Sequence, residues 1–82
     1  MDISAMRHAA GLTQTELAAE LGVPQTTVSR LERQTEWKLS TLVDYMQGLD
    51  AEVRLTVSLP NGGAVVYELV AGDFKIAREF SG

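Results

Sequence analysis

A glycine–proline corner at Gly22 and Pro24 constrains the fold of this chain more than any other feature. Gly22 can adopt the positive φ that ends a helix, and Pro24 fits only the first turn of the next helix. Upstream, Thr13 and Glu16 have the spacing of a capping box, in which each side chain bonds the backbone amide of the other residue. The sequence therefore predicts a helix-turn-helix unit, with the small Ala18 where the two backbones approach.

The helix after this corner has one apolar side and one polar side. Val28 and Leu31 are three residues apart and supply the buried side. The opposite side has no large apolar residue; it carries Thr26, Ser29, Arg30 and Arg33, with Gln25 at its N-terminal margin. These residue types read base edges in a DNA major groove. The pattern by itself is equally compatible with ordinary helix packing.

A further helix is predicted on each side of this pair. The first runs from Ile3 to Ala10 with Asp2 as its N-cap. The second covers residues 38–48, with Ser40 as a plausible N-cap and Gly48 as a plausible stop. Its apolar side chains recur at helical spacing, namely Leu39, Leu42, Val43 and Met46.

The hydrophobic period changes to two near residue 50. Apolar residues at 53, 55, 57 and 59 alternate with polar ones, which is typical of a half-buried strand. Residues 60–63 (PNGG) are a strong turn signal, and the β-branched segment Ala64 to Val70 completes a β-hairpin. An isolated hairpin is marginal in water, so it must pack on the helices, a second subunit or a partner. The tail, Asp73 to Phe80, is compatible with a short helix or with a frayed end.

These elements define an α+β chain that is mainly α: four to five short helices with a helix-turn-helix, then a C-terminal antiparallel β-hairpin. We expect residues 1–49 to form the helical domain. Residues 50–82, the hairpin and tail, would serve dimerisation or partner binding. At 82 residues the chain has the length of one compact domain overall.

Composition excludes several kinds of chemistry. The chain has no cysteine and a single histidine, His8, so disulfides, thiolate zinc sites and multi-histidine metal sites are excluded. No apolar run approaches the ~20 residues of a membrane span, and no signal-peptide pattern begins the chain, so we expect a cytoplasmic protein without membrane contact. The acidic residues show no spacing that demands acid–base catalysis. We therefore predict no enzyme activity, no metal and no cofactor.

The net charge of −4 at first argues against nucleic acid as a partner. Residues 1–40 carry only −1 of it, and residues 41–82 carry −3. Arg30 and Arg33 stand on the polar side of the second motif helix without a nearby exposed acid if Glu32 and Glu16 are engaged internally. Binding depends on this local surface rather than on the charge of the whole chain.

The stretches 11–18 (GLTQTELA) and 21–32 (LGVPQTTVSRLE) resemble the Cro/repressor (XRE) family of helix-turn-helix DNA-binding domains. The match covers roughly residues 6 to 33 and keeps many positions in register. The resemblance implies a DNA-binding function for the helical domain, residues 1–49. It implies a phosphate contact for Gln14, base contacts for Gln25, Thr26 and Ser29, and a backbone contact for Thr27.

The remaining candidate residues divide into DNA contacts and structural positions. Arg30 is a further candidate for base reading, and Arg33 and Lys38 are candidates for phosphate contact or for plain solvated charge. Arg7 and Glu32 match positions that the family often pairs in a buried salt bridge between the first and third helices. The predicted structural residues are Arg7, Glu32, Gly22, Thr13 and Ala18.

After the helix-turn-helix the chain continues as residues 39–46 (LSTLVDYM) and Leu49, followed by an alternating strand and an Asn-Gly-type hairpin. This continuation is similar to HigA-like antitoxins and small related XRE regulators. Such proteins repress their own operon as dimers, and the antitoxins also bind a small ribonuclease toxin. The resemblance implies a homodimer on a palindromic double-stranded operator and a possible basic toxin partner for the acidic second half. Alternatives are a stand-alone XRE regulator and a protein-interaction module that keeps the fold. Because a hairpin replaces the family's commoner fifth helix, the dimer could form through the hairpin or through the helix at residues 38–48.

Overall fold

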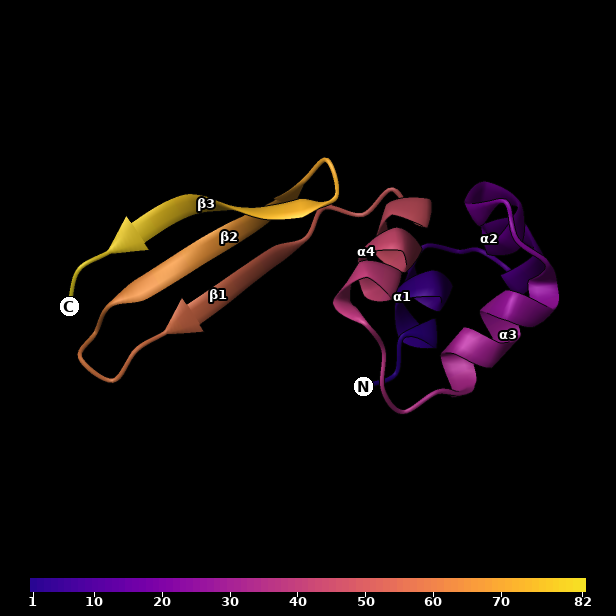
Figure 1. The fold of residues 1–82 in the computed structure, drawn as a ribbon, viewed down its shortest axis with the longest axis horizontal. Helices are drawn as coiled ribbons and strands as arrows, with labels where there is room; N and C mark the ends of the chain where they lie inside the picture. Colours follow the sequence, from indigo (N-terminus) through magenta and orange to yellow (C-terminus); the bar gives the residue numbers. More distant parts are fainter. The chain divides into compact units, whose positions relative to one another are not determined.

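The computed structural model describes residues 1–82 as four helices followed by three strands (Figure 1). The chain divides into two compact units, the helical unit (Met1–Ala51) and the sheet unit (Glu52–Gly82), where its length had suggested one domain. In chain order the elements are α1 (Ser4–Ala9), α2 (Gln14–Leu21), α3 (Gln25–Arg33), α4 (Leu39–Gly48), β1 (Arg54–Ser58), β2 (Ala64–Val70) and β3 (Asp73–Phe80). The α+β class and the helical first half agree with the sequence prediction. None of the four helices has the length and hydropathy that a membrane crossing requires.

The helical unit has a hydrophobic core to which all four helices or their flanks contribute. Ile3, Leu17, Val28 and Tyr45 are fully buried, and α2 packs against both α3 and α4. Ala18 is 3% exposed and belongs to the same core cluster, as its small size at the helix crossing predicted. This core fixes the orientation of the two motif helices.

Local signals set the ends of the two motif helices. Thr13 Oγ1 accepts from the Glu16 amide at 3.1 Å, and Glu16 Oε1 accepts from the Thr13 amide at 3.0 Å, so the capping box is present. Gly22 ends α2 in the left-handed region with φ 68°. Pro24 is the N-cap of α3, which begins at Gln25.

The outer helices differ from the prediction at their ends. α1 begins at Ser4 with Ile3 as N-cap, although Asp2 Oδ1 still accepts from the Ser4 amide at 3.0 Å. α4 begins one residue before Ser40, with Lys38 as N-cap and no side-chain cap. Gly48 lies inside α4 rather than after it. A Cβ on Gly48 would lie 2.6 Å from Leu21 Cδ2, so the glycine permits close packing of α4 against α2.

The sheet unit is a three-stranded antiparallel sheet with β2 in the centre. The predicted hairpin is its first two strands. The tail is neither helical nor frayed: it forms β3, which pairs with β2 through a tight turn at Ala71 and Gly72. The spacing of Phe74, Ala77 and Phe80 imitated a helix because a register shift in β3 adds one residue and interrupts the period of two.

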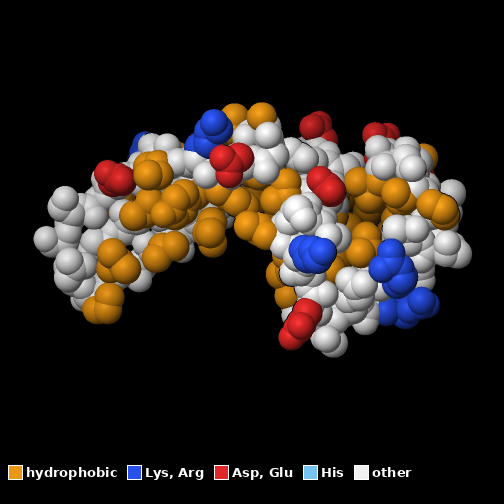
Figure 2. All heavy atoms as spheres, viewed as in Figure 1, with side chains coloured by type: hydrophobic (Ala, Val, Ile, Leu, Met, Phe, Trp, Pro, Cys, Tyr) orange, Lys and Arg blue, Asp and Glu red, His pale blue; other side chains and the backbone are white.

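One face of this sheet is a grid of three cross-strand rows. The register places the side chains of each row on the same face. We term this face the apolar grid; its rows are Val53, Leu69 and Phe74, then Leu55, Tyr67 and Ile76, then Val57, Val65 and Glu79. No apolar side chain of the sheet unit is buried, and hydrophobic side chains gather along its strands in Figure 2. The sheet unit therefore has no hydrophobic core of its own.

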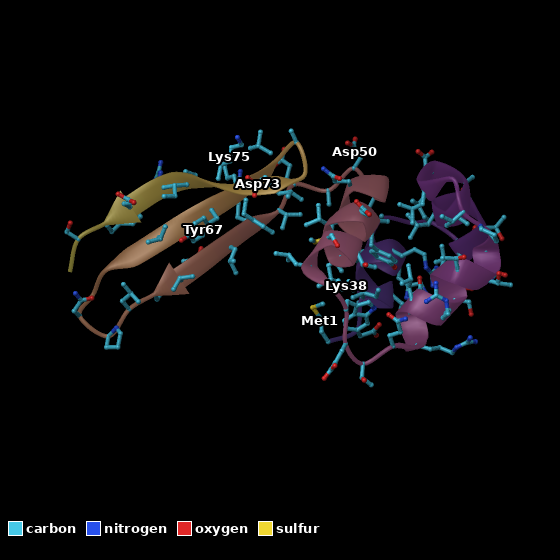
Figure 3. All side chains as sticks on the ribbon, viewed as in Figure 1. Met1, Lys38, Asp50, Tyr67, Asp73 and Lys75 are labelled. Carbon is cyan, nitrogen blue, oxygen red and sulfur yellow. The ribbon has the colours of Figure 1, made fainter.

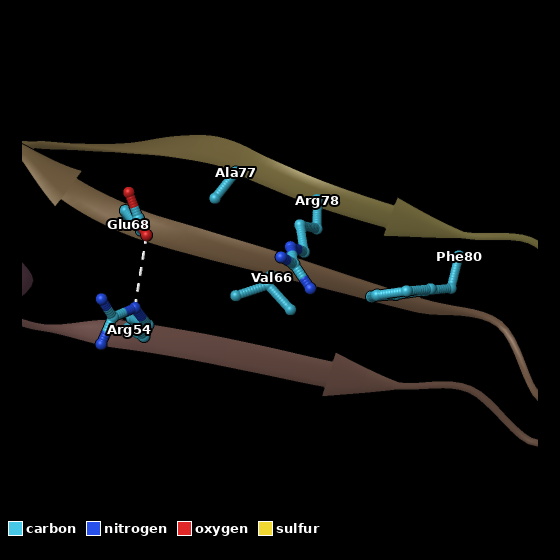
Figure 4. Close-up of a pocket in the computed structure, with 6 residues that line it drawn as sticks. All are labelled: Arg54, Val66, Glu68, Ala77, Arg78 and Phe80. Atoms are coloured by element: carbon cyan, nitrogen blue, oxygen red, sulfur yellow. Dashed lines mark hydrogen bonds and ion pairs between the residues drawn. The ribbon is translucent and has the colours of Figure 1, made fainter.

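The opposite face of the sheet is mixed: it carries charged side chains together with apolar ones such as Val66, Val70 and Phe80. Arg54 Nε lies 3.3 Å from Glu68 Oε1, and both side chains are exposed enough for the pair to add little stability. Beside this ion pair lies a shallow hollow of about 560 Å³, shown in Figure 4 and lined by Arg54, Val66, Glu68, Ala77, Arg78 and Phe80. The charged side chains of the sheet thus lie mainly on this face, and Glu79 is the exception on the apolar grid.

Candidate nucleic-acid interface

The helix α3 presents the polar side that the sequence predicted. Val28 on its inner side is fully buried, and this anchors α3 against the core. On the outer side, four predicted contact residues are exposed: Gln25, Thr26, Arg30 and Arg33. Thr27 and Ser29 are partly buried. The predicted contact residues of α3 therefore lie on one short helix that begins directly at the corner.

An ion pair connects α1 to α3 behind this surface. Arg7 Nε donates to Glu32 Oε2 at 2.8 Å and Arg7 Nη2 donates to Glu32 Oε1 at 3.0 Å. Their side chains are 9% and 6% exposed, so the pair is almost wholly removed from water. Arg7 Nη1 also donates to the Leu12 carbonyl at 2.9 Å, which holds the loop before α2. The predicted pairing of these two residues is confirmed.

The carboxylate of Glu32 also accepts two hydrogen bonds that sequence reasoning missed. Gln14 Nε2 and the Tyr45 hydroxyl each donate to it at 3.0 Å. One carboxylate on α3 thereby joins α1, α2 and α4. A tyrosine at a buried helix position needs a partner for its hydroxyl, and that was the one available signal for Tyr45.

This network shifts the pKa values of its members. Burial by itself would raise the pKa of Glu32, but the hydrogen bonds from Arg7, Gln14 and Tyr45 outweigh it and lower the pKa. Hydrogen bonding to Glu32 raises the pKa of Arg7. Burial, followed by the hydrogen bond to Glu32, raises the pKa of the Tyr45 hydroxyl. Glu32 is therefore ionised at neutral pH and can act only as an acceptor.

The ionised Glu32 fixes the direction of the hydrogen bonds out to the surface. Because Glu32 only accepts, Gln14 must donate to it through Nε2 and turns its Oε1 outward. Gln25 Nε2 then donates to Gln14 Oε1 at 2.6 Å. The exposed amide of Gln25 is thus held in one orientation, with Oε1 and the second N–H of its Nε2 left for another partner.

The cations of this surface are free of acidic partners. Arg33 Nη1 lies 3.3 Å from Ser29 Oγ, and no ion pair involves Arg30, Arg33 or Lys38. Lys38 stands at the N-terminal end of α4 in Figure 3. A hollow of about 440 Å³ between α3 and the start of α4 includes Arg30 and Lys38 in its lining. These positive charges remain available to an anionic partner.

A capped helix, a glycine corner and a second helix with a polar outer side define a helix-turn-helix DNA-binding domain of the XRE class. The helix-turn-helix family model matches residues 3–54, and the chain belongs to this family. Membership places the chain among DNA-binding regulators.

The curated relatives that match are antitoxins. Antitoxin HigA1 of Mycobacterium tuberculosis, from strain CDC 1551 / Oshkosh and from strain ATCC 25618 / H37Rv, is 44% identical to this chain over 57 residues. The aligned segment is 68% of this chain and 38% of the relative, so the chain spans well under half the length of the relatives it matches. No solved structure gives a significant match.

Proposed function

We propose that this chain is a sequence-specific transcriptional repressor that binds a palindromic operator as a homodimer in the cytoplasm. Each subunit would place α3 in the major groove, with two half-sites about one helical turn, ~34 Å, or a multiple of it apart. Occupancy of the operator would exclude the transcription machinery, and no cofactor is required. The observation that carries the proposal is the exposed polar side of α3, whose first residue is held by the Glu32–Gln14–Gln25 chain of hydrogen bonds.

The oriented amide of Gln25 makes the proposal specific. With one N–H engaged by Gln14, Gln25 offers one acceptor and one donor side by side. This is the pattern that pairs with N6 and N7 of adenine in the major groove. Thr26 and Ser29 lie along the same helix and would contact neighbouring bases, and Arg30 would read a base edge or the backbone. We therefore expect an A·T pair opposite Gln25 in each half-site.

The remaining predicted contacts would position the domain on the phosphates. Thr27 and Arg33 are the candidates on α3, and Gln14 lies at the N-terminus of α2, where backbone amides attract anions. Gln14 Nε2 is already bonded to Glu32, so Gln14 would meet a phosphate through its backbone amide. Few cations are present per subunit, and we expect a shallow dependence of binding on salt concentration.

The test is operator selection followed by titration of variants. Sequences bound by the chain are selected from a random DNA pool, and affinities for the selected site are then measured by fluorescence anisotropy. Gln25→Ala or Thr26→Ala should each weaken binding by about 1–3 kcal/mol with little change in stability. Gln25→Ala should also relax the preference for its A·T pair.

Gln47→Ala is the matched control. Gln47 is an exposed glutamine on α4, outside the two motif helices, and its loss should leave DNA affinity unchanged. If Gln25→Ala and Thr26→Ala both bind as tightly as the parent chain, α3 is not the reading helix. Absence of any salt-sensitive DNA binding by the parent would favour the protein-interaction module instead.

A second role is favoured by the similarity to antitoxin HigA1. We propose that the chain also neutralises a small basic ribonuclease toxin and thereby regulates its own operon. The acidic side chains suited to such a partner are Asp44, Asp50, Glu52, Glu68, Asp73 and Glu79. The helical unit has a net charge of −3 and the sheet unit a net charge of −1, so the helical unit is the more acidic of the two.

A neighbouring gene for a small basic ribonuclease is the first discriminating observation. Co-expression of its product with this chain should give a complex that survives purification and suppresses RNA cleavage. If the two proteins separate and cleavage continues, the chain is a stand-alone XRE regulator. DNA binding by the chain alone does not depend on this result.

A further inference from the structure

The apolar grid of the sheet unit has no partner within that unit. Leu55, Val57 and Ile76 are 49%, 41% and 59% exposed, and Leu59 beyond the end of β1 is 48% exposed. Eight of the nine grid positions are apolar. A sheet with one hydrophobic face must bury that face against another layer to form a stable domain. Something outside the sheet unit must cover this face.

We propose that a second copy of this chain covers it, so that two sheets stack face to face through their apolar grids. This inference rests on the proposed homodimer and specifies its surface. Stacked sheets pack about 10 Å apart with side chains from both inner faces interdigitating. The dimer would then be held by a six-stranded sandwich whose interface contains no residue of α3.

The charges of the sheet unit are compatible with a second copy of this chain as the partner. Glu79 is the one acidic or basic residue of the grid, and it occupies a corner, where it can stay at the solvent-exposed rim of an interface. Two symmetric arrangements are possible. If the twofold axis of the dimer runs parallel to the strands, Glu79 lies opposite the partner's Val57. If the axis runs perpendicular to the strands in the plane of the interface, Glu79 lies opposite the partner's Phe74. Neither arrangement opposes two carboxylates. The sheet unit carries a net charge of only −1, so two copies repel each other little.

The same charges disfavour a basic protein as the occupant of this face. A basic partner is recognised through acidic surface, and Glu68 and Asp73 point to the opposite face of the sheet. Strand addition at the open edge of β1 is also less suitable. It would join two apolar grids side by side and leave both in water. Face-to-face stacking covers both grids at once.

The size of the grid sets the expected affinity. At ~4.8 Å between strands and ~6.6 Å between same-face residues, nine positions cover about 290 Å² of flat sheet. Two such faces come to about 580 Å² of flat sheet; side chains above that plane add accessible area, but the total stays at or below the lower end of the ~1,200–2,000 Å² of stable interfaces. We therefore expect a reversible dimer with a dissociation constant in the micromolar range.

The test is sedimentation equilibrium of the 82-residue chain from about 1 to 300 µM, a range chosen to bracket a micromolar equilibrium. The parent should pass from 8.9 kDa to twice that mass. Leu55→Glu should keep the chain at 8.9 kDa throughout. Thr56→Glu, the next residue on the same strand but on the opposite face, should dimerise as the parent does.

Two further variants keep the result interpretable. Ile76→Thr keeps a β-branched side chain and therefore the strand propensity of β3, and it should weaken the dimer at least ~10-fold. Thr56→Pro blocks edge pairing alone. The Val53 carbonyl and the Leu59 amide both hydrogen-bond toward β2. Because the backbone groups of a strand point alternately to its two sides, the Thr56 amide points away from β2, toward the open edge of β1. Thr56→Pro should still dimerise. Far-UV circular dichroism checks the fold of each variant.

Three results would overturn the proposal. If the parent chain stays monomeric, the apolar grid is covered by the helical unit or by a different protein rather than by a second copy. Dissociation by Thr56→Pro but not by Leu55→Glu would show edge pairing, and a dimer insensitive to all four variants would lie in the helical unit. Gel shifts with DNA that contains a single half-site test the dimer surface and the proposed repressor function separately. A monomeric Leu55→Glu chain that still binds a half-site supports both, whereas a grid-dependent dimer without DNA binding removes only the repressor function.

Discussion

The two units of this chain acquire their stability in different ways. The helical unit buries Leu17, Val28 and Tyr45 completely and surrounds the Glu32 carboxylate with donors from three helices. The sheet unit buries no apolar side chain. Its strands have good pairing and alternation but no second layer, and a domain requires two packed layers around one core. The comparison teaches that regular hydrogen bonding specifies a sheet without providing the burial that stabilises it.

Separating the units should produce the largest effect. A fragment of residues 1–51 should unfold cooperatively, because its core lies within those residues. A fragment of residues 52–82 that carries Leu55→Glu, and so cannot form the stacked dimer, should lose its strand signal at about 10 µM, because an uncovered sheet of this size is not stable in water. Far-UV circular dichroism of both fragments makes the measurement. A structured, monomeric 52–82 fragment would remove the distinction between the units.

Loss of the buried arginine should be the next largest effect. Arg7→Ala leaves the buried Glu32 carboxylate without a counter-charge and should lower the free energy of unfolding of the helical unit by about 3–5 kcal/mol. Denaturant unfolding followed by Trp37 fluorescence reports on this unit, since Trp37 packs on its core. Arg30→Ala, which removes an exposed arginine from α3, should change stability by less than ~0.5 kcal/mol. Equal effects of the two substitutions would contradict a special role for the ion pair.

Much of the fold was predictable because its signals are local. The capping box at Thr13, the left-handed Gly22 and the change of period near residue 50 each act within a few residues of the chain. β3 was not predictable in this way. The residue added at its register shift disguises the alternation, and a strand depends on a partner that is distant in sequence. The change of period also predicted a boundary at residues 49/50, close to the division after residue 51, but the separation into two compact units depends on packing rather than on local pattern.

The candidate site also combines features that a local sequence pattern predicts with features that depend on contacts distant in sequence. The polar side of α3 follows from helical periodicity, and the pairing of Arg7 with Glu32 was implied by the family resemblance. The donors Gln14 and Tyr45 were missed because they come from α2 and α4, and no local pattern brings four helices to one carboxylate. Sequence reasoning found the surface of the site but not the hydrogen bonds that orient it. The base and phosphate contacts stay predictions.

Acid should weaken the helical unit in a way that traces to Glu32. Its pKa is lower in the folded chain than in the unfolded one, because three donors outweigh burial. The stabilisation is therefore complete above the ordinary carboxyl pKa of ~4.3 and is lost as pH falls from there through the lowered value. Trp37 fluorescence during urea unfolding at a series of pH values measures this dependence.

Glu32→Gln should be less stable at neutral pH and should lose part of the acid dependence. Glu16, whose pKa the Thr13 amide lowers, and Asp2, whose pKa the Ser4 hydroxyl lowers, are exposed and supply a residual slope. Glu20→Gln, an exposed carboxylate on α2, is the control and should leave the slope unchanged. An unchanged slope in Glu32→Gln would mean that other carboxylates govern acid unfolding.

The two tyrosines of the chain provide the finest comparison, because each unit contains one. Tyr45→Phe removes a single donor to a charged and buried acceptor and should lower the free energy of unfolding of the helical unit by about 1.5 kcal/mol. Glu32 keeps its bonds to Arg7 and Gln14, so this effect is smaller than that of Arg7→Ala. Tyr67, labelled on β2 in Figure 3, is only partly buried, and its hydroxyl has no hydrogen-bond partner.

Tyr67→Phe should therefore change the stability of either unit by less than ~0.5 kcal/mol. Urea unfolding monitored by Trp37 fluorescence and by far-UV circular dichroism gives both values from one titration. If the two variants lose equal stability, the loss belongs to the aromatic ring and its packing, and the Glu32 network would then hold its geometry without the hydroxyl. A loss confined to Tyr45→Phe assigns the difference to a hydrogen bond that only a unit with a core can exclude from water.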